Sequence, residues 1–329
     1  MDSYRIFKLN LFGLFRPGKS FKLKQMKQKI LRANLFIGPG LIILSAILLA
    51  LSVPFMKHWF YTFVWWSFIL FLDGLNFRLQ GDSLLAQSVK KFLLLAFYSI
   101  SFWCFFEICD LRLQNWSYHD LPASRPERWL GYFLSYATVI PALKELEIFW
   151  YGFFKGKKLA LFRVTASQTL MSSFYVSGAT CLALSLVWPR IFFPLIWLAF
   201  AFLLEPLNYS QKNPSLLGEV EQGKWDRFWS VVLAGLSAGF FWEFWNFWAG
   251  SHWEYYLPYL NFGRIFKMPI LGYTGFMPFA LEAFAATSLF LALVDKWGKK
   301  KIAQLTFVPA CLLFDVFVFH LIDLFIFKP

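Results

Sequence analysis

Long apolar segments separated by short polar ones run through almost the whole chain. A helix needs about 20 mostly apolar residues to cross a bilayer, and the sequence offers about nine such segments. They are residues 33–54, 59–77, 91–111, 130–152, 164–187, 191–208, 228–249, 270–294 and 304–327. The pattern predicts an all-α, polytopic integral membrane protein. The boundary between the fifth and sixth segments, at Trp188-Pro189-Arg190, and the start of the fourth are the least clearly marked.

The composition supports the same class of protein. Hydrophobic residues make up 58% of the 329 residues and charged residues only 16%, with a mean hydropathy of +0.53. Soluble globular chains carry about 25% charged residues, so an ordinary soluble protein is excluded. The cysteines show no Cys-x-x-Cys or Cys/His spacing, so neither a disulfide framework nor a zinc site is expected at Cys104, Cys109, Cys181 and Cys311.

Basic side chains are distributed unevenly between the two sides of the predicted spans. With the N-terminus inside, 23 of the 32 Lys and Arg residues fall on the inner side. This predicts a multi-pass cell-membrane protein with a cytoplasmic N-terminus and an extracytoplasmic C-terminus. Residues 1–32 mix basic and apolar side chains and are expected to lie on the lipid surface. Nucleic acid is the alternative partner for the net charge of +13, but no nucleic-acid-binding module accompanies it.

Polar residues that a bilayer should exclude recur at fixed distances along the chain. Trp65, Asp73, Asn76, Ser83, Leu84 and Leu85 recur, all at one spacing, as Trp197, Glu205, Asn208, Ser215, Leu216 and Leu217. Glu107 and Asp110 recur at a slightly longer common spacing as Glu243 and Asn246. Trp116, Tyr118, Tyr136, Pro141 and Glu145 recur, again at one spacing, as Trp253, Tyr255, Tyr273, Pro278 and Glu282. The recurrence predicts an ancient duplication.

The duplication divides the chain into five segments. These are a basic interfacial segment, 1–32; a first membrane repeat, 33–152; a short basic cytoplasmic linker, 153–163; a second membrane repeat, 164–294; and one extra C-terminal transmembrane helix within 295–329. Each repeat is expected to hold four spans, and an even number gives both repeats the same orientation. A pseudo-twofold axis along the membrane normal should then relate the two repeats.

Four glutamates are the catalytic candidates, because intramembrane acids are costly and mark functional sites by default. Residues three apart share a helix face, so Glu107 and Glu243 each form a polar patch with Asp110 or Asn246. Glu145 and Glu282 each follow a proline by four residues, and a proline inside a helix kinks it. We expect all four glutamates to meet in a pocket shared by the repeats. The expected substrate-binding residues are Asp110, Asn246, Trp116, Tyr118, Trp253, Tyr255, Tyr136 and Tyr273.

A structural role is the alternative for each of these groups. Carboxyl groups that are neutral or paired would bind helices to one another, and Trp and Tyr also collect at membrane interfaces. His320 and Asp323, three residues apart, suit an interhelical pair better than a proton relay. Helix capping or headgroup contact is as well supported as function for a second polar cluster, Asp73, Asn76, Glu205 and Asn208.

Clustered carboxyl groups in an aromatic cavity suit two chemistries. A desolvated carboxyl group can donate a proton near neutral pH, and aromatic faces attract cations. Together they would protonate an isoprenoid double bond and steer the carbocation. Carboxylates holding Mg²⁺ are the alternative, but a dense Asp cluster is lacking, so no metal is assigned and no cofactor is identified. The chain has four histidines, and only His320 lies in a predicted span. A membrane b-type cytochrome, which needs paired axial histidines, is therefore disfavoured.

Two motifs carry a family resemblance. Glu107 precedes Trp116-Ser117-Tyr118 by nine residues, and Glu243 precedes Trp253-Glu254-Tyr255 by ten. Each half therefore resembles the membrane lycopene cyclase repeat of the small heterodimeric or fused type, in which an acidic span end, a Trp-x-aromatic and a Pro-x-Glu-Glu follow one another. Pro141-Ala-Leu-Lys-Glu145 and Pro278-Phe-Ala-Leu-Glu282 depart from this pattern in spacing and carry one Glu instead of two. The resemblance spans roughly residues 90–150 and 227–290 and implies isoprenoid or carotenoid-like chemistry.

Three functions follow from these expectations. The first is a membrane enzyme that acts on a hydrophobic, isoprenoid or carotenoid-like lipid by acid-initiated isomerisation or cyclisation. The second is a proton-coupled or lipid-handling transporter that uses the interface between the repeats. The third is a non-catalytic subunit that holds pigment or quinone in a larger membrane complex. Membrane lipid and a hydrophobic small molecule are the expected partners, and the third function adds other membrane subunits.

Overall fold

A computed structural model describes residues 20–157, 159, 162–259, 262–298 and 301–328. The first half contains α1 (Ser20–Ala50), α2 (Pro54–Gln80), α3 (Leu84–Gln87), α4 (Val89–Leu113), β1 (Trp116–His119), α5 (Arg125–Tyr136) and α6 (Val139–Phe154). The second half contains α7 (Gln168–Val187), α8 (Pro189–Phe192), η2 (Phe193–Leu195), α9 (Ile196–Ser210), α10 (Leu216–Glu221), α11 (Asp226–Trp248), β2 (His252–Tyr255), β3 (Arg264–Ile265), β4 (Met268–Pro269), η3 (Ile270–Gly275) and α12 (Phe276–Trp297). The chain continues with α13 (Lys301–Phe325) and β5 (Phe327–Lys328). Of the expected interfacial segment 1–32, residues 1–19 lie outside the described residues.

Eight stretches of the described chain are helical, long and apolar enough to cross a membrane. They are Gln28–Ala50, Pro54–Gln80, Val89–Leu113, Gln168–Val187, Pro189–Ser210, Asp226–Trp248, Ile270–Trp297 and Thr306–Phe325. The all-α expectation is therefore confirmed in its main feature. The expected span over 130–152 is the one that is not among the eight, because that segment is divided into two shorter helices, α5 and α6.

Pro141 accounts for the division between α5 and α6. A proline ring clashes with the carbonyl group of the residue four positions earlier, so a helix is interrupted before the proline. α6 accordingly begins at Val139 with Pro141 as its third residue. The Ser99 hydroxyl of α4 bridges the break by donating to the Tyr136 carbonyl at 2.5 Å and accepting the Ile140 N–H at 3.0 Å. Pro278 is likewise the third residue of α12. The expected kink within a span is therefore wrong at both prolines, which lie in first turns that need no N–H donor.

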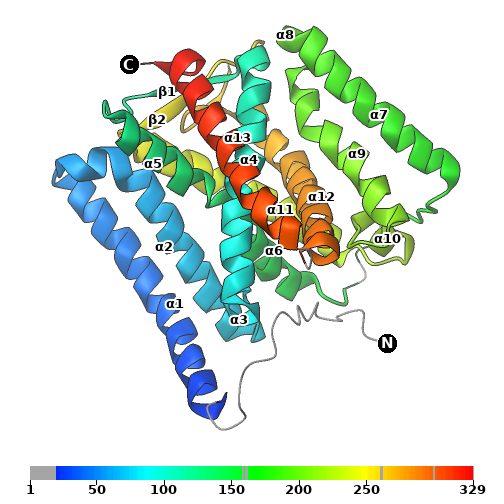
Figure 1. The fold of residues 1–329 in the computed structure, drawn as a ribbon, viewed down its shortest axis with the longest axis horizontal. Helices are drawn as coiled ribbons and strands as arrows, with labels where there is room; N and C mark the ends of the chain where they lie inside the picture. Colours follow the sequence, from blue (N-terminus) through cyan, green and yellow to red (C-terminus); the bar gives the residue numbers. More distant parts are fainter. Residues whose placement is uncertain (1–19, 158, 160–161, 260–261, 299–300, 329) are drawn as a thin grey trace.

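The two halves show the same succession of elements. A helix pair (α1 with α2, α7 with α9) is followed by a short helix (α3, α10), a long helix (α4, α11), a strand (β1, β2) and a further helix (α6, α12). Figure 1 shows the two helix pairs at opposite edges of the molecule, with α4, α6, α11 and α12 between them. α6 packs along α11, α12 packs along α9 and α11, and α13 packs on α4.

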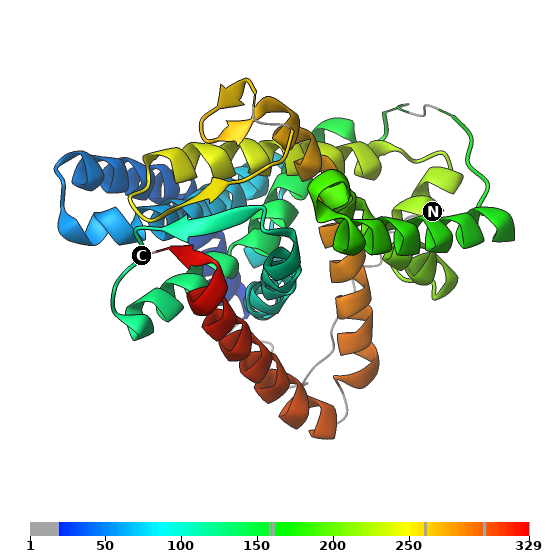
Figure 2. The same cartoon turned by 90° about the horizontal axis from the view of Figure 1, so that it is seen from above.

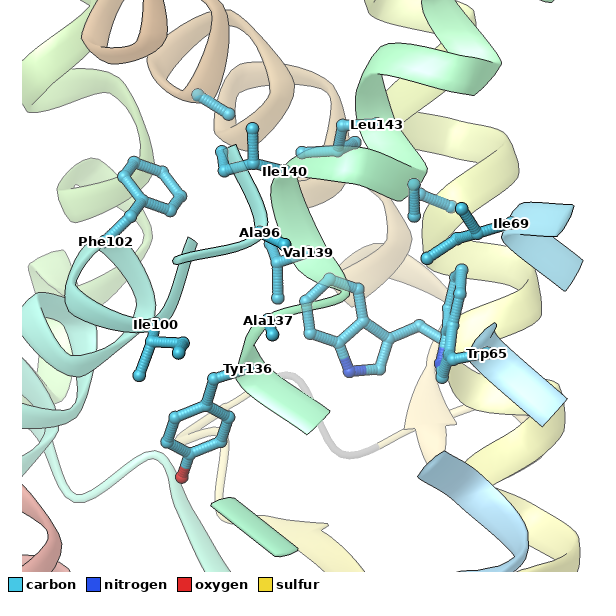
Figure 3. Packing of buried hydrophobic residues seen from close by; sticks show 14 of the residues in the cluster. Trp65, Ile69, Ala96, Ile100, Phe102, Tyr136, Ala137, Val139, Ile140 and Leu143 are labelled. Carbon is cyan, nitrogen blue, oxygen red and sulfur yellow. The ribbon is translucent and has the colours of Figure 1, made fainter. Parts of the chain in front are cut away.

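The strands gather at one end of the helices. β1 pairs with β2 and β5 in a three-stranded sheet of order β2-β1-β5, and the C-terminal end of the chain lies beside it (Figures 1 and 2). The short helices α3 and α10 lie toward the opposite end. The larger of two apolar core clusters includes Trp65 and Ile69 of α2, Ile100 and Phe102 of α4, and Tyr136 of α5 (Figure 3).

Glycines allow α1 and α2 to pack closely. A Cβ atom at Gly74 of α2 would meet the backbone nitrogen of Leu35 and come within 2.9 Å of its Cα atom, whereas a Cβ at Gly40 of α1 would meet nothing within 4 Å. We expect Gly74→Val to destabilise this helix pair by about 1–3 kcal/mol through overpacking. The midpoint of thermal unfolding in detergent, with proteolysis of the turn at 51–53, measures the effect. The matched Gly40→Val should leave both unchanged, and equal effects of the two substitutions would contradict the packing explanation.

Candidate functional site

A cavity of about 500 Å³ lies beneath the strand ribbon, between the two halves. Its volume falls within the range of about 300–1,000 Å³ that is usual for small-molecule sites. Side chains of α2, α4, α5, β1, α9, α11, β2, η3 and α12 contribute to its wall. Aromatic side chains form a large part of the wall and include Trp59, Tyr61, Trp103, Trp116, Tyr118, Tyr132, Tyr136, Trp197, Trp242, Trp253, Tyr255, Phe276 and Phe279.

The antiparallel pairing of β1 with β2 brings the two Trp-x-Tyr motifs together. Trp116 lies opposite Tyr255, and Tyr118 lies opposite Trp253. Alternate residues of a strand point to the same face, so the Trp and Tyr of each motif all reach the cavity, while the residue between them points away. β5 adds a parallel strand beside β1, and the Tyr118 N–H donates to the Ile326 carbonyl at 3.0 Å.

Glu107 of α4 is fully buried behind the first Trp-x-Tyr motif. Four donors point at its carboxyl group. Oε1 accepts the Trp103 indole N–H at 2.6 Å, the Tyr118 hydroxyl at 2.5 Å and the Tyr136 hydroxyl at 3.1 Å. Oε2 accepts the Trp116 indole N–H at 3.2 Å. All four donor side chains line the cavity, whereas Glu107 itself does not. The hydroxyl and indole side chains that bond to Glu107 therefore lie between its carboxyl group and the cavity.

Glu243 of α11 occupies the corresponding position in the second half but has fewer partners. Oε1 accepts the Tyr255 hydroxyl at 2.7 Å. Oε2 makes no hydrogen bond within the described part of the chain, although the Trp253 indole lies near it. The position of Trp103, four residues before the glutamate, is occupied by Gly239, whose missing side chain leaves room for the Phe276 ring. The Tyr273 hydroxyl donates to the Ile265 carbonyl at 3.1 Å, so Tyr273 does not repeat the contact of Tyr136.

The strand tyrosines keep their hydroxyl protons. Burial, and after it the neighbouring Glu107, raises the pKa of Tyr118 well above its usual value. Burial and Glu243 do the same to the pKa of Tyr255. Both tyrosines line the cavity, and a protonated hydroxyl beside a carboxyl group is suited to pass a proton without becoming a stable phenolate.

Asp110 and Asn246, expected to bind substrate, instead hold the strand ends. Asp110 Oδ1 accepts the Asn115 N–H at 2.7 Å, immediately before β1. The Asn246 amide accepts the Trp253 N–H at 3.0 Å and donates to the Trp253 carbonyl at 2.9 Å. Neither residue lines the cavity. Their geometry fixes the positions of the Trp-x-Tyr motifs.

Glu145 and Glu282 lie away from the cavity wall. Glu145 accepts the Asn76 side-chain N–H at 2.7 Å and the Leu84 N–H at 2.9 Å, so it belongs with the second polar cluster. Glu282 accepts the Phe200 N–H of α9 at 2.8 Å. The expectation that all four glutamates share one pocket is therefore wrong. Glu145 faces α2 and the start of α3, whereas Glu282 faces α9, so their equal spacing from a proline does not give them equal surroundings.

The second polar cluster holds the short helices in both halves. Asp73 accepts the Leu85 N–H at 3.0 Å, and Glu205 accepts the Leu217 N–H at 2.7 Å. These N–H groups lie in the first turns of α3 and α10, where a carboxylate is favourable. Asn76 and Asn208 donate to the carbonyl groups of Glu145 and Ala285, both at 2.8 Å. This geometry favours the capping alternative for Asp73 and Glu205, whereas Asn76 and Asn208 form interhelical hydrogen bonds to α6 and α12.

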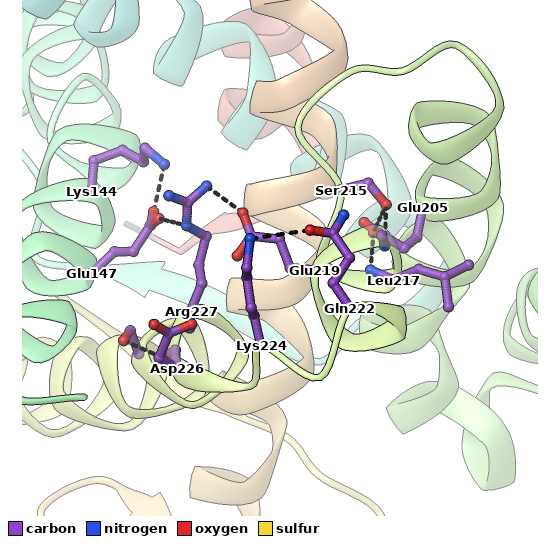
Figure 4. A network of polar contacts seen from close by, with 12 residues as sticks. Lys144, Glu147, Glu205, Ser215, Leu217, Glu219, Gln222, Lys224, Asp226 and Arg227 are labelled. Carbon is purple, nitrogen blue, oxygen red and sulfur yellow. Dashed lines mark hydrogen bonds and ion pairs between the residues drawn. The ribbon is translucent and has the colours of Figure 1, made fainter. Parts of the chain in front are cut away.

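Charged side chains form a further network between α6, α10 and α11. Figure 4 shows Lys144 donating to Glu147, with Arg227 beside Glu147 and Glu219. The Arg227 guanidinium lies 2.9 Å from Glu219 and 3.9 Å from Glu147. Lys144, the one basic residue expected within a span, is thus paired with an acid one turn further along α6.

Several parts of the site do not follow from the expectations above. Trp103 and Trp242 complete the aromatic wall, and the spacing of Trp103 four residues before Glu107 on one helix face is the available signal. Asp323 of α13 accepts Arg128 at 2.7 Å and 2.9 Å. The last helix does make an interhelical contact, but Asp323 pairs with Arg128 of α5, while His320 lies 2.8 Å from Arg125.

Comparison with protein-family models, with curated proteins and with solved structures gives no match.

Proposed function

We propose that this chain is a membrane-embedded enzyme that binds a hydrophobic, isoprenoid-type molecule in the aromatic cavity and isomerises or cyclises it by acid-initiated chemistry. One observation carries the proposal. Two cavity-lining tyrosines, Tyr118 and Tyr255, each donate a hydroxyl hydrogen bond to a buried glutamate, at 2.5 Å and 2.7 Å. Of the four candidate glutamates, Glu107 and Glu243 are the proposed acid–base pair, because Glu145 and Glu282 lie away from the cavity wall.

The proposed arrangement includes insertion in a membrane and an ancient duplication. The eight apolar helices support the first, and the distribution of Lys and Arg favours a cytoplasmic N-terminus. Contacts that recur between the halves support the second. Glu107 and Glu243 bond to the Tyr of their own Trp-x-Tyr motifs, and Asp73 and Glu205 bond to Leu85 and Leu217. α13 is then an addition after two related halves.

The proposed reaction needs no oxidant or reductant. A carboxyl O–H bond breaks as its proton moves through a tyrosine hydroxyl to an alkene carbon, where a C–H bond forms. The resulting carbocation lies among aromatic rings, which stabilise cations more strongly when water is excluded. Loss of a proton from a neighbouring carbon to the second carboxylate leaves a shifted double bond or, after attack by a second alkene, a ring.

Lipid extraction tests the proposal directly. The full chain is purified in detergent, and the hydrophobic molecules that remain bound are identified by mass spectrometry. We expect an isoprenoid product from the wild-type chain and its unconverted precursor from Glu107→Gln and from Glu243→Gln. Glu205→Gln, a substitution in the second polar cluster, is the matched control and should yield the product.

Two results would reject this function. Absence of any isoprenoid from a folded wild-type protein would reject the ligand class. Recovery of the same isoprenoid, in the same form, from the wild type and both cavity variants would reject catalysis and indicate a pigment- or quinone-holding subunit.

A further inference from the structure

We infer that the two glutamates have opposite proton states in the resting protein, with Glu107 ionised as the proton acceptor and Glu243 protonated as the proton donor. The chemical roles rest on the proposed function. The difference in proton state rests on the different hydrogen bonding of the two carboxyl groups.

The contacts of Glu107 favour its carboxylate form. Each of its oxygens accepts an indole N–H, from Trp103 on Oε1 and from Trp116 on Oε2. An indole N–H can only donate, so each oxygen has at least one neighbour that requires it to act as an acceptor. The Tyr118 and Tyr136 hydroxyls add two further donors. Several donors aimed at one carboxyl group stabilise its negative charge in a buried site.

The surroundings of Glu243 favour the carboxylic acid. Its side chain is fully buried, and Oε2 has no hydrogen-bond partner within the described residues. The Tyr255 hydroxyl is the one donor at hydrogen-bonding geometry, with the Trp253 indole nearby. A buried charge with so few donors is costly, and a carboxyl group in such a place avoids the cost by keeping its proton. The neighbouring ionisable groups are Tyr61 of α2, Tyr255 of β2 and Tyr273 of η3. Lys267, the nearby cation, lies 3.6 Å from Glu254 instead.

Sequence differences between the halves produce this asymmetry. Gly239 replaces the indole donor that Trp103 supplies, and the space beside Gly239 is occupied by the Phe276 ring. Tyr273, the counterpart of Tyr136, donates to the Ile265 carbonyl. Two related carboxyl groups in different environments can thus take the two complementary roles in one reaction. After a reaction, Glu243 has lost its proton and Glu107 has gained one. Exchange with water then returns a proton to Glu243 and removes one from Glu107.

Infrared difference spectroscopy tests the inference without a substrate. Spectra of the full-length wild-type chain in detergent are compared with those of Glu243→Gln and Glu107→Gln. We expect Glu243→Gln to lose a protonated-carboxyl C=O band that shifts in D₂O. Glu107→Gln should lose carboxylate bands and keep that C=O band. Tyr255→Phe should shift the C=O band, and Tyr118→Phe should shift the carboxylate bands, which keeps the test valid if one Gln variant does not fold.

The outcomes separate this inference from the proposed function. Loss of the same kind of band in both Gln variants, or of the two kinds in reverse, would overturn the division of roles even if both variants fail to convert the isoprenoid. The expected bands in a protein that retains no isoprenoid would support the division of proton states while rejecting the proposed function.

Discussion

Replacing Asp323 with alanine is expected to destabilise the protein by about 3–5 kcal/mol, because it leaves a buried guanidinium without its counter-charge. Arg128 Nε and Nη2 donate to Asp323 at 2.7 Å and 2.9 Å, and both side chains are only 9% exposed. The Trp129 indole also donates to this carboxylate at 2.9 Å. Asp323→Ala therefore removes the acceptor of several buried donors at once, and the midpoint of thermal unfolding measures the loss.

Asp120→Asn is the control for this prediction. Asp120 lies 3.7 Å from Lys57, with both side chains more than half exposed, and exposed pairs contribute only about 0–1 kcal/mol. Asn removes the charge and, like Asp, tolerates the left-handed backbone of this position (φ 52°). The double substitution Arg128→Met with Asp323→Leu should recover much of the stability, because no charge remains buried. If Asp323→Ala and Asp120→Asn lower the midpoint equally, the α5–α13 pair does not hold the helices together.

Glu107→Leu is expected to destabilise the protein far more than Glu243→Leu. The first substitution leaves the indole N–H groups of Trp103 and Trp116 without an acceptor. Each buried donor left unsatisfied costs about 1–3 kcal/mol, so these two groups alone cost about 2–6 kcal/mol. The second substitution removes one well-formed hydrogen bond, from the Tyr255 hydroxyl, at a cost of about 1–3 kcal/mol; the Trp253 indole lies near Glu243 without a bond of that geometry.

Thermal midpoints of the two leucine variants and of Glu107→Gln make the comparison. The Gln side chain keeps one carbonyl acceptor, so its midpoint should lie between those of the wild type and Glu107→Leu. A lower midpoint for Glu243→Leu than for Glu107→Leu would contradict the hydrogen-bonding asymmetry on which the division of proton roles depends.

The length of each apolar segment predicts most of the long helices well. A helix that crosses a bilayer needs about 20 mostly apolar residues, so each such helix leaves a long apolar segment in the sequence. Such segments predict α2, α4, α11 and α12 with small errors at their ends. Hydrophobic length does not predict the division between α5 and α6. The apolar segment is continuous there, and the break is caused by Pro141, which is accommodated only in the first turn of a new helix. The Ser99 hydroxyl that bridges the break comes from another helix, and no local pattern reveals it.

The site is only partly predictable, for a related reason. The recurring distances pair Glu107 and Glu243 with the Trp-x-Tyr motifs, and the structure shows the corresponding hydrogen bonds. Glu145 and Glu282 also recur at one distance from a proline, which suggests that they have matching surroundings. The structure does not give them matching surroundings, because different helices pack against them. The ribbon of β1 and β2 pairs segments from opposite halves of the chain, and their sequences do not predict that pairing.

The parallel strand β5 has a consequence for biosynthesis. Ile326 accepts the Tyr118 N–H, and Phe327 lies opposite Tyr118 in the sheet, so residues near the C-terminus complete the support of the first Trp-x-Tyr motif. The complete sheet, in the order β2-β1-β5, therefore cannot form until β5 has been synthesised along with the strands of both halves.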